Sequence, residues 1–267
     1  AVYAASGVDV KFGAATFEGN HSKKKGGALY VSESITVNEN VTFQKNGADG
    51  TDGMGGAIYS VKDVTLQKAA FKENSSGGSG GAVYADGVVK GTGSTFQANQ
   101  AILDGGAIYA TGAAVLEDCS FLNNSTRGPG GAIRTDNAGT DVQSCTFKEN
   151  TSGTNGGAVF LYGGAGASSF KKVCFVKNTA SDSGGAISCS GTGAGNTIGV
   201  SDSVFLNNTA GRSQGGALSL AGTQATVVRS TFEANECATG SGGAIFSAAA
   251  LSRIANCTFY DNQAGSS

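Results

Sequence analysis

Hydrophobic residues recur along this chain in two short patterns that repeat together. In the first pattern, Gly-Gly-Ala is followed by an aliphatic residue and, two positions later, by a small or apolar one, as at Ile108 and Ala110. In the second pattern, an apolar residue and a small residue precede a Phe by five and two positions, as at Leu116, Cys119 and Phe121. Alternation of apolar and polar positions is typical of a strand with one buried face. Each repeat therefore predicts two short strands.

The two patterns recur down the whole chain. Gly-Gly-Ala begins at nine positions that lie 25 to 31 residues apart: Gly26, Gly55, Gly80, Gly105, Gly130, Gly156, Gly184, Gly215 and Gly242. A Phe with an Asn three residues later occurs ten times, at Phe17, Phe43, Phe71, Phe96, Phe121, Phe147, Phe175, Phe205, Phe232 and Phe259 with Asn20, Asn46, Asn74, Asn99, Asn124, Asn150, Asn178, Asn208, Asn235 and Asn262. A fixed period of this length indicates a stacked repeat architecture.

These Phe and Asn residues are predicted to form a structural ladder. If each coil lies on the previous one in register, the Phe rings make one buried row. A buried aromatic side chain removes about 150 to 250 Å² from water, so this row supplies a large share of the core. The Asn lies where the strand turns, a position where Asn tolerates left-handed backbone geometry and where stacked amides bond one another.

Composition agrees with an all-β solenoid. The chain has 44 Gly and one Pro among 267 residues, yet 39% of its residues are hydrophobic, and no helix-period stretch lies between the glycines. The unbroken repeat predicts one segment, residues 1–267, of about ten coils. Its first residues read as the end of another GGAVY motif, and the chain stops where the next GGA is due. We therefore expect a piece of a longer repeat array.

The net charge and the lengths of the apolar stretches limit the kinds of partner expected for this chain. The net charge is −2 and the pI is about 5.4, so the basic surface of a nucleic-acid binder is not expected. No apolar stretch reaches the about 18 residues that span a membrane, so we expect no membrane insertion by this segment. Asp49 and Asp52 lie in a Gly-rich loop and offer carboxylates to Ca²⁺, but their spacing does not match an EF-hand and favours an ordinary turn. We expect no metal and no cofactor.

The pair GGA[ILV] and FxxN resembles the repeat of the chlamydial polymorphic outer membrane protein family over essentially all 267 residues. This resemblance implies a right-handed parallel β-helix of the pectin-lyase-like type. In that family the helix is the adhesive passenger of an autotransporter. The repeat is also similar to stretches of other large extracellular and surface proteins, and an extracellular or cell-surface location is expected.

One outward column is mostly aromatic. The residue directly after the aliphatic residue of the GGA motif is Tyr or Phe in seven coils, at Tyr3, Tyr30, Tyr59, Tyr84, Tyr109, Phe160 and Phe246. Stacked tyrosines stabilise a sheet through contacts between neighbouring strands. Exposed aromatic side chains are also enriched at interfaces. The column is thus either a stabilising stack or a contact stripe for a glycan, a partner chain or a neighbouring subunit.

Two further sets of residues are candidates for covalent modification. Asn40 and Asn256 lie in N-x-[ST] sequences and project outward by the alternation, so they are glycosylation candidates in a eukaryotic secretory pathway. Cys119 and Cys145 share a column in neighbouring coils, with Cα atoms expected about 5 Å apart, within disulfide range. Two buried thiols are the alternative, because Ala, Val and Ser fill this column elsewhere. Cys174 falls outside the column and is expected to be exposed.

The expected function is structural or adhesive. Parallel β-helices include polysaccharide lyases and hydrolases, so activity must be argued from a site. Such catalysis needs converging carboxylates, or a base with Arg or Lys, in a groove; here the acidic residues are scattered, and His21 has no expected partner. We expect a non-enzymatic rigid shaft or filament module in which weak contacts sum over the coils. Its partners would be other copies, other surface proteins, glycans or a host receptor. The alternatives are an autotransporter-type adhesin and a polysaccharide-acting enzyme.

Overall fold

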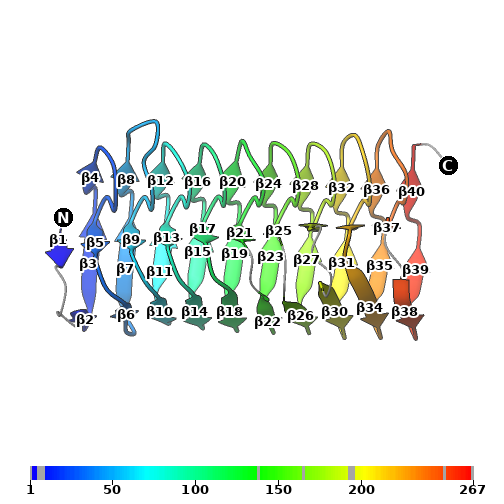
Figure 1. Cartoon of the computed structure of the whole chain (residues 1–267), viewed down its shortest axis with the longest axis horizontal. Helices are drawn as coiled ribbons and strands as arrows, with labels where there is room; N and C mark the ends of the chain where they lie inside the picture. Colours follow the sequence, from blue (N-terminus) through cyan, green and yellow to red (C-terminus); the bar gives the residue numbers. More distant parts are fainter. Residues whose placement is uncertain are drawn as a thin grey trace.

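The computed structural model describes residues 2–4, 10–136, 139–163, 166–191, 196–248 and 251–265. Every helix or strand assigned in these ranges is a β-strand, and the strands form four parallel sheets of ten strands each. The coils follow one another along a straight rod whose two ends carry the chain termini (Figure 1). The prediction of an all-β parallel solenoid of about ten coils is confirmed. The right-handed turn that the resemblance implies stays a prediction.

The first sheet follows the GGA motif. Its strands are β1 (Val2–Ala4), β5 (Leu29–Val31), β9 (Ile58–Ser60), β13 (Val83–Ala85), β17 (Ile108–Ala110), β21 (Ile133–Asp136), β25 (Val159–Tyr162), β29 (Ile187–Ser190), β33 (Leu218–Ala221) and β37 (Ile245–Ser247). The second sheet contains β2 (Val10–Phe12), β6 (Ile35–Val37), β10 (Val64–Gln67), β14 (Val89–Thr92), β18 (Ala114–Glu117), β22 (Asp141–Gln143), β26 (Ala167–Lys171), β30 (Thr197–Ser201), β34 (Gln224–Val228) and β38 (Leu251–Ala255).

The third sheet carries the Phe of each coil. Its strands are β3 (Ala15–Glu18), β7 (Val41–Gln44), β11 (Ala70–Lys72), β15 (Thr95–Gln97), β19 (Ser120–Leu122), β23 (Thr146–Lys148), β27 (Cys174–Val176), β31 (Val204–Leu206), β35 (Thr231–Glu233) and β39 (Thr258–Tyr260). The short strands of the fourth sheet are β4 (His21–Ser22), β8 (Gly47–Ala48), β12 (Ser75–Ser76), β16 (Gln100–Ala101), β20 (Ser125–Thr126), β24 (Thr151–Ser152), β28 (Thr179–Ala180), β32 (Thr209–Ala210), β36 (Glu236–Cys237) and β40 (Gln263–Ala264).

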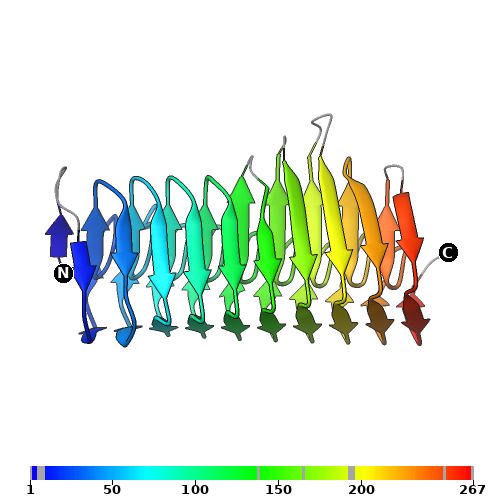
Figure 2. The ribbon, with the colours of Figure 1, turned by 90° about the horizontal axis from the view of Figure 1, so that it is seen from below.

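Each coil thus has four strands where the sequence predicted two. The pattern that ends in Phe was read as one strand, but it divides between the second and third sheets, as at Leu66 in β10 and Phe71 in β11. Lys68, the first of the two residues between these strands, has a φ of 47°. A left-handed residue reverses the local bend of the chain and ends a straight strand. The coils lie side by side along the rod (Figure 2).

The Phe rings form the inner row of the core. Corresponding residues pair between adjacent coils, so that Phe71 pairs with Phe43 and Phe96. The centroids of successive rings from Phe17 to Phe259 lie 4.6 to 5.0 Å apart, with ring planes within 11° of each other. The eight rings from Phe43 to Phe232 are completely buried. The parallel strand spacing therefore sets the ring spacing.

The Asn residues form a second internal row of hydrogen bonds. The backbone N–H and the side-chain amide of Asn124 both donate to the Oδ1 atom of Asn150, each at 3.0 Å, and the same amide donates to the carbonyl of Phe96 at 3.0 Å. Asn124 Oδ1 in turn accepts both bonds from Asn99. The expected left-handed geometry lies elsewhere, because the preceding residue, Asn123, has the positive φ of 55°. Asn124, which is completely buried, instead completes the hydrogen bonds of this turn.

The two glycines that close each coil have different roles. Gly105 has a φ of 60°, which a residue with a Cβ rarely adopts. A Cβ on Gly106 would lie 2.0 Å from the carbonyl oxygen of Gly131 in the next coil. The first glycine is thus required by backbone conformation, and the second by the close approach of neighbouring coils.

Candidate functional site: the outer aromatic row

The aromatic column found in the sequence is a continuous stack on the outer face of the first sheet. We call residues Tyr3, Tyr30, Tyr59, Tyr84, Tyr109, Arg134 and Phe160 the outer row. The centroids of the five Tyr rings are 4.8 to 5.3 Å apart, and successive planes differ by 12 to 17°. They stack because strand alternation turns the aliphatic residue inward and the next residue outward. Contacts between neighbouring strands therefore stabilise this face.

Most of the row is not open to solvent. Tyr3, in the first coil, is 70% exposed, whereas Tyr59, Tyr84 and Phe160 are 3, 9 and 5% exposed. Tyr30, Tyr109 and Phe246 are partly buried. The expectation of freely exposed rings is wrong for the middle of the row, because each ring covers the faces of its neighbours. The contact role of these residues stays a prediction.

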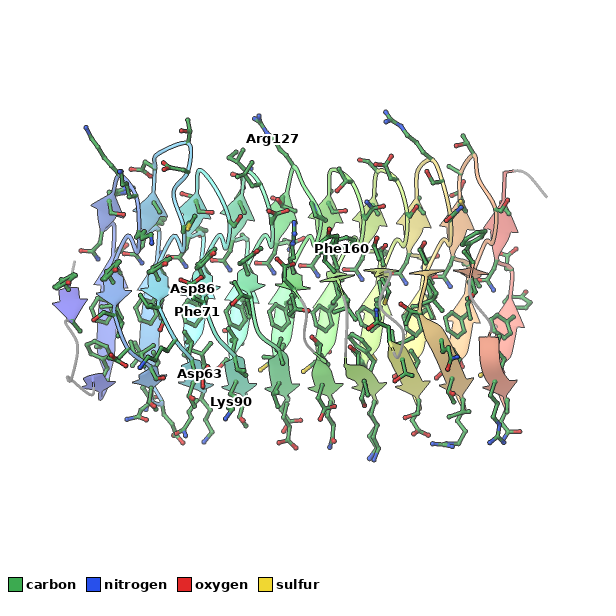
Figure 3. The ribbon with its side chains drawn as sticks, viewed as in Figure 1. Asp63, Phe71, Asp86, Lys90, Arg127 and Phe160 are labelled. Carbon is green, nitrogen blue, oxygen red and sulfur yellow. The ribbon has the colours of Figure 1, made fainter. Side chains whose placement is uncertain are left out.

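Charged groups bind the hydroxyls of the row. Tyr59 donates a hydrogen bond to Asp86 at 2.7 Å, and Tyr109 donates one to Asp136 at 2.6 Å. Lys25 donates to the hydroxyl oxygen of Tyr59 at 2.8 Å, and its Nζ lies 4.1 Å from the ring centroid. Figure 3 labels Asp86 and Phe160 on this part of the rod. The outer row is therefore an aromatic stack edged by carboxylates and a Lys.

Arg134 replaces a Tyr in the sixth coil and continues the stack with its guanidinium. This group lies 5.5 Å from the centroid of Tyr109 and 5.7 Å from that of Phe160, within cation–π range. Arg134 also forms ion pairs with Asp104 and, at 3.0 Å, with Asp136. All three charged side chains are 20% exposed or less. The pairs are thus well shielded from water and join two adjacent coils.

The tyrosines of this row act as hydrogen-bond donors. Burial and the carboxylate of Asp86 raise the pKa of Tyr84 to about 12. Burial, followed by the hydrogen bond to Asp86, raises the pKa of Tyr59, and the same causes with Asp136 raise that of Tyr109. A phenol with a raised pKa stays neutral near pH 7. The arrangement therefore favours structural bonding over general-base chemistry by these side chains.

The sequence places Arg134 in the outward column, but the charged partners of the row were missed. Asp86 and Asp136 each lie two residues after a member of the row, which places them on the same outward face by strand alternation. That spacing was the available signal. Asp104 gave no such signal in the sequence. It lies in the turn before the GGA motif of the preceding coil, and it contacts Arg134 only because the two coils stack.

The two candidate disulfide cysteines lie together as free, buried cysteines. The backbone N–H of Cys119 donates to Cys145 Sγ at 3.2 Å. The contact with Cys119 and burial raise the pKa of the Cys145 thiol, which disfavours the reactive thiolate. Cys174 is exposed, as its place outside this column predicts.

The glycosylation candidates Asn40 and Asn256 are both exposed. They have φ values of 63° and 55°, so each lies at the bend between the second and third sheets. In contrast, Asn74, Asn124 and Asn150, which also begin N-x-[ST] sequences, belong to the buried ladder. The structure therefore leaves Asn40 and Asn256 accessible, and their modification stays a prediction.

The Gly-rich acidic loop contains an unexpected pair. His21 Nδ1 lies 2.9 Å from Asp49 Oδ2, which corrects the expectation that this His has no partner. Each side chain is 55% exposed, so the pair adds little stability. Within the described ranges, no group of three or more His, Cys, Asp or Glu residues is arranged to hold a metal ion.

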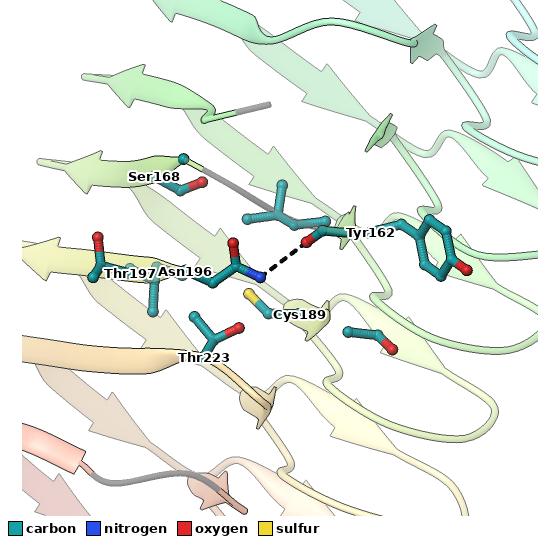
Figure 4. Close-up of a pocket in the computed structure, with 11 residues that line it drawn as sticks. Tyr162, Ser168, Cys189, Asn196, Thr197 and Thr223 are labelled. Carbon is teal, nitrogen blue, oxygen red and sulfur yellow. Dashed lines mark hydrogen bonds between the residues drawn. The ribbon is translucent and has the colours of Figure 1, made fainter. Parts of the chain in front are cut away.

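Two hollows have linings that include no residue of the outer row. Figure 4 shows the first, lined by Tyr162, Ser168, Cys189, Asn196 and Thr223, where the Asn196 amide donates to the Gly163 carbonyl at 3.0 Å. Its volume of about 20 Å³ holds about one water molecule. The second is a groove of about 350 Å³ on the outer face of the second sheet. Its lining includes Thr65, Lys90, Val115, Glu117 and Asp141.

Comparison with known proteins identifies the repeat. The family model of the Chlamydia polymorphic membrane protein repeat matches residues 14–32, 40–61, 69–86, 93–111, 118–136, 144–162 and 172–190, about half of the chain. The coils beyond residue 190 continue the same strand pairing. No curated protein and no solved structure matches the chain. The described part of the chain has no helix of the length and apolar character needed to cross a membrane.

Proposed function

The chain belongs to the Chlamydia polymorphic membrane protein repeat family, and from this premise we propose that it is a non-enzymatic passenger rod displayed at a cell surface. The family is associated with the outer membrane and the surface. In this proposal the rod holds a repeated outer face at fixed spacing and makes adhesive contacts with a partner protein.

The observation that carries the proposal is the continuity of the two internal rows. Stacked Phe rings and hydrogen-bonded Asn side chains join adjacent coils from Phe17 and Asn20 to Phe259 and Asn262. A coil held by its neighbours on both sides cannot tilt without breaking several of these contacts. Contacts on the outer face are therefore held at a spacing of about 4.8 Å per coil, and weak contacts sum when several engage one partner.

The outer row supports a protein partner better than a stacked sugar. A sugar ring packs on a free aromatic face, and the faces of Tyr59 and Tyr84 are covered by neighbouring rings. Asp86 is exposed and accepts a bond from Tyr59, so its carboxylate is presented beside an apolar stack. Such an edge suits an Arg or Lys side chain with apolar neighbours.

The test is adhesion of beads coated with the whole chain to cultured epithelial cells. We expect the coated beads to bind, soluble chain to compete, and Asp86→Asn to reduce the number of bound beads several-fold. Asp141→Asn is the matched control, because Asp141 is exposed on the second sheet, away from the row. Beads that bind no better than uncoated beads would contradict the adhesive role.

The enzyme alternative can be tested with the same preparation. A polysaccharide-acting enzyme would release soluble oligosaccharides from acidic and neutral polysaccharides. We expect no release, because the smaller hollow has room for about one water molecule and the larger groove is an open sheet face.

A further inference from the structure

The outer face of the third sheet has a symmetric pattern around the gap between β27 and β31. On this face the residue directly after each Phe points outward. From β19 to β39 these residues are Leu122, Lys148, Val176, Leu206, Glu233 and Tyr260. The order is apolar, basic, apolar, apolar, acidic, apolar. Read from either end, the positions match in apolar character, and the two charges are opposite.

The residue directly before each Phe also points outward and has the same symmetry. In the same strands these residues are Ser120, Thr146, Cys174, Val204, Thr231 and Thr258. Two small hydroxyl residues lie on each side of an apolar pair. Cys174 and Val204 are exposed, and Val204 is 37% exposed. We call these two columns together the symmetric face.

A two-fold axis parallel to the strands, midway between β27 and β31, would place this face against itself. Such an axis brings β23 of one copy opposite β35 of the other, and β27 opposite β31. Lys148 then faces Glu233 of the second copy, and Val176 faces Leu206. Isologous interfaces need this kind of self-complementarity, because each residue pair occurs twice.

The residues at the bend beside the face add a second complementary pair. Lys172 and Asp202 occupy equivalent places in adjacent coils, before β27 and β31, and the same axis brings them together. Asp202 is bound by Arg229 at 2.7 and 2.9 Å in its own chain. The carboxylate has further lone pairs for a Lys from a second copy.

We propose that the symmetric face binds a second copy of this chain, with the two rods antiparallel. This inference goes beyond the adhesive function and does not depend on it. The apolar centre, Cys174, Val176, Val204 and Leu206, is the only position on the two columns where apolar residues of adjacent strands lie in a two-by-two block. When the same block of a second copy covers this block, both blocks are removed from water. Lys148 of each copy then pairs with Glu233 of the other copy.

The size of the face predicts a weak dimer. Six strands and their flanking bends cover roughly 400 Å², about half of the area that a standard interface buries on each partner. The dimer is thus expected to depend on concentration in solution. On a surface, tethering of many copies would raise their effective concentration and favour pairing.

The test exploits the opposite charges across the axis. Sedimentation of the whole chain, which has a mass of 26.3 kDa, should show a reversible monomer–dimer equilibrium at concentrations up to about 1 mM. Lys148→Glu or Glu233→Lys alone creates two repulsive pairs and should weaken dimerisation by roughly 10-fold or more. A mixture of the two variants should dimerise again, because each mixed dimer contains two attractive pairs.

Controls separate this outcome from general charge effects. Lys72→Glu changes an exposed Lys in the same column but outside the symmetric face, and should leave dimerisation unchanged. Thermal unfolding of each variant shows that the fold is kept. A chain that stays monomeric up to about 1 mM overturns the proposal. A dimer that is insensitive to both charge reversals, or that the mixture does not restore, also overturns it.

Discussion

Two aromatic rows run along the same rod, and they differ in continuity. The inner Phe row continues through all ten coils with centroids 4.6 to 5.0 Å apart. The outer row contains Tyr in five coils, changes to Arg134 and Phe160, and ends there, because Ser188 occupies the position in the next coil. Both rows have the spacing of parallel strands, but a missing inner ring leaves a cavity, whereas water or another side chain can replace an outer ring. Packing thus requires the inner row, and the outer row is free to vary.

The largest effect should come from breaking the inner row. Phe121→Ala removes a completely buried ring that stacks on Phe96 and Phe147. We expect the free energy of unfolding to fall by about 4 kcal/mol, measured by urea denaturation. Tyr84→Ala, in the outer row, is the matched change and should cost clearly less, since the vacated space adjoins solvent. Equal losses would contradict the distinction between the rows.

The second largest effect should come from the Asn ladder. Asn124→Ala leaves Asn150 Oδ1 with fewer donors and removes the acceptor of two bonds from Asn99. Because these groups are buried away from water, we expect a loss of about 3 kcal/mol. Asn123→Ala provides a control at an exposed neighbour with a positive φ. The ladder interpretation fails if the two substitutions have the same effect on urea denaturation.

A smaller effect should follow from changing the charge that continues the outer row. Arg134→Ala leaves Asp104 and Asp136 close together without their shared partner. We expect about 2 kcal/mol of destabilisation at low salt, because the carboxylates are only partly exposed. Arg229→Ala, at an exposed pair with Asp202, is the control and should cost clearly less, because water and salt screen an exposed ion pair. Denaturation of both variants at low and high salt measures the difference.

The smallest effect concerns the pH dependence of the outer row. The folded-state pKa of Tyr84 is raised from 10.0 to about 12. A raised folded pKa means that the stabilisation is complete below pH 10 and is lost as pH rises toward 12. We expect stability to fall in this window by about 1 kcal/mol per pH unit, and Tyr84→Phe to reduce that slope. Denaturation midpoints at pH 9 to 12 measure this pH dependence. If the unchanged chain and Tyr84→Phe lose stability with the same slope, the assignment to Tyr84 is refuted.

The fold was largely predictable from the sequence, and the candidate site only in part. Ten repeats of the same motif leave one way to bury each Phe, which is to stack it on the next one. The burial of Tyr59 and the pairs of Arg134 were not predictable, because they depend on residues from other coils, such as Lys25 and Asp104. From the sequence, the left-handed backbone geometry was expected at the Asn of each repeat, whereas the structure has it at the residue before the Asn. The sequence does not distinguish the two positions, because both fit a turn.

The sequence by itself determined the period, the inward columns and the parallel stack, because these follow from local alternation repeated at a fixed interval. Only the tertiary structure decided which outward residues meet. Lys148 and Glu233 become members of one symmetric face through the register of β23 to β35. Residues 85 positions apart come within four adjacent strands because each coil advances the rod by a single strand spacing of about 4.8 Å.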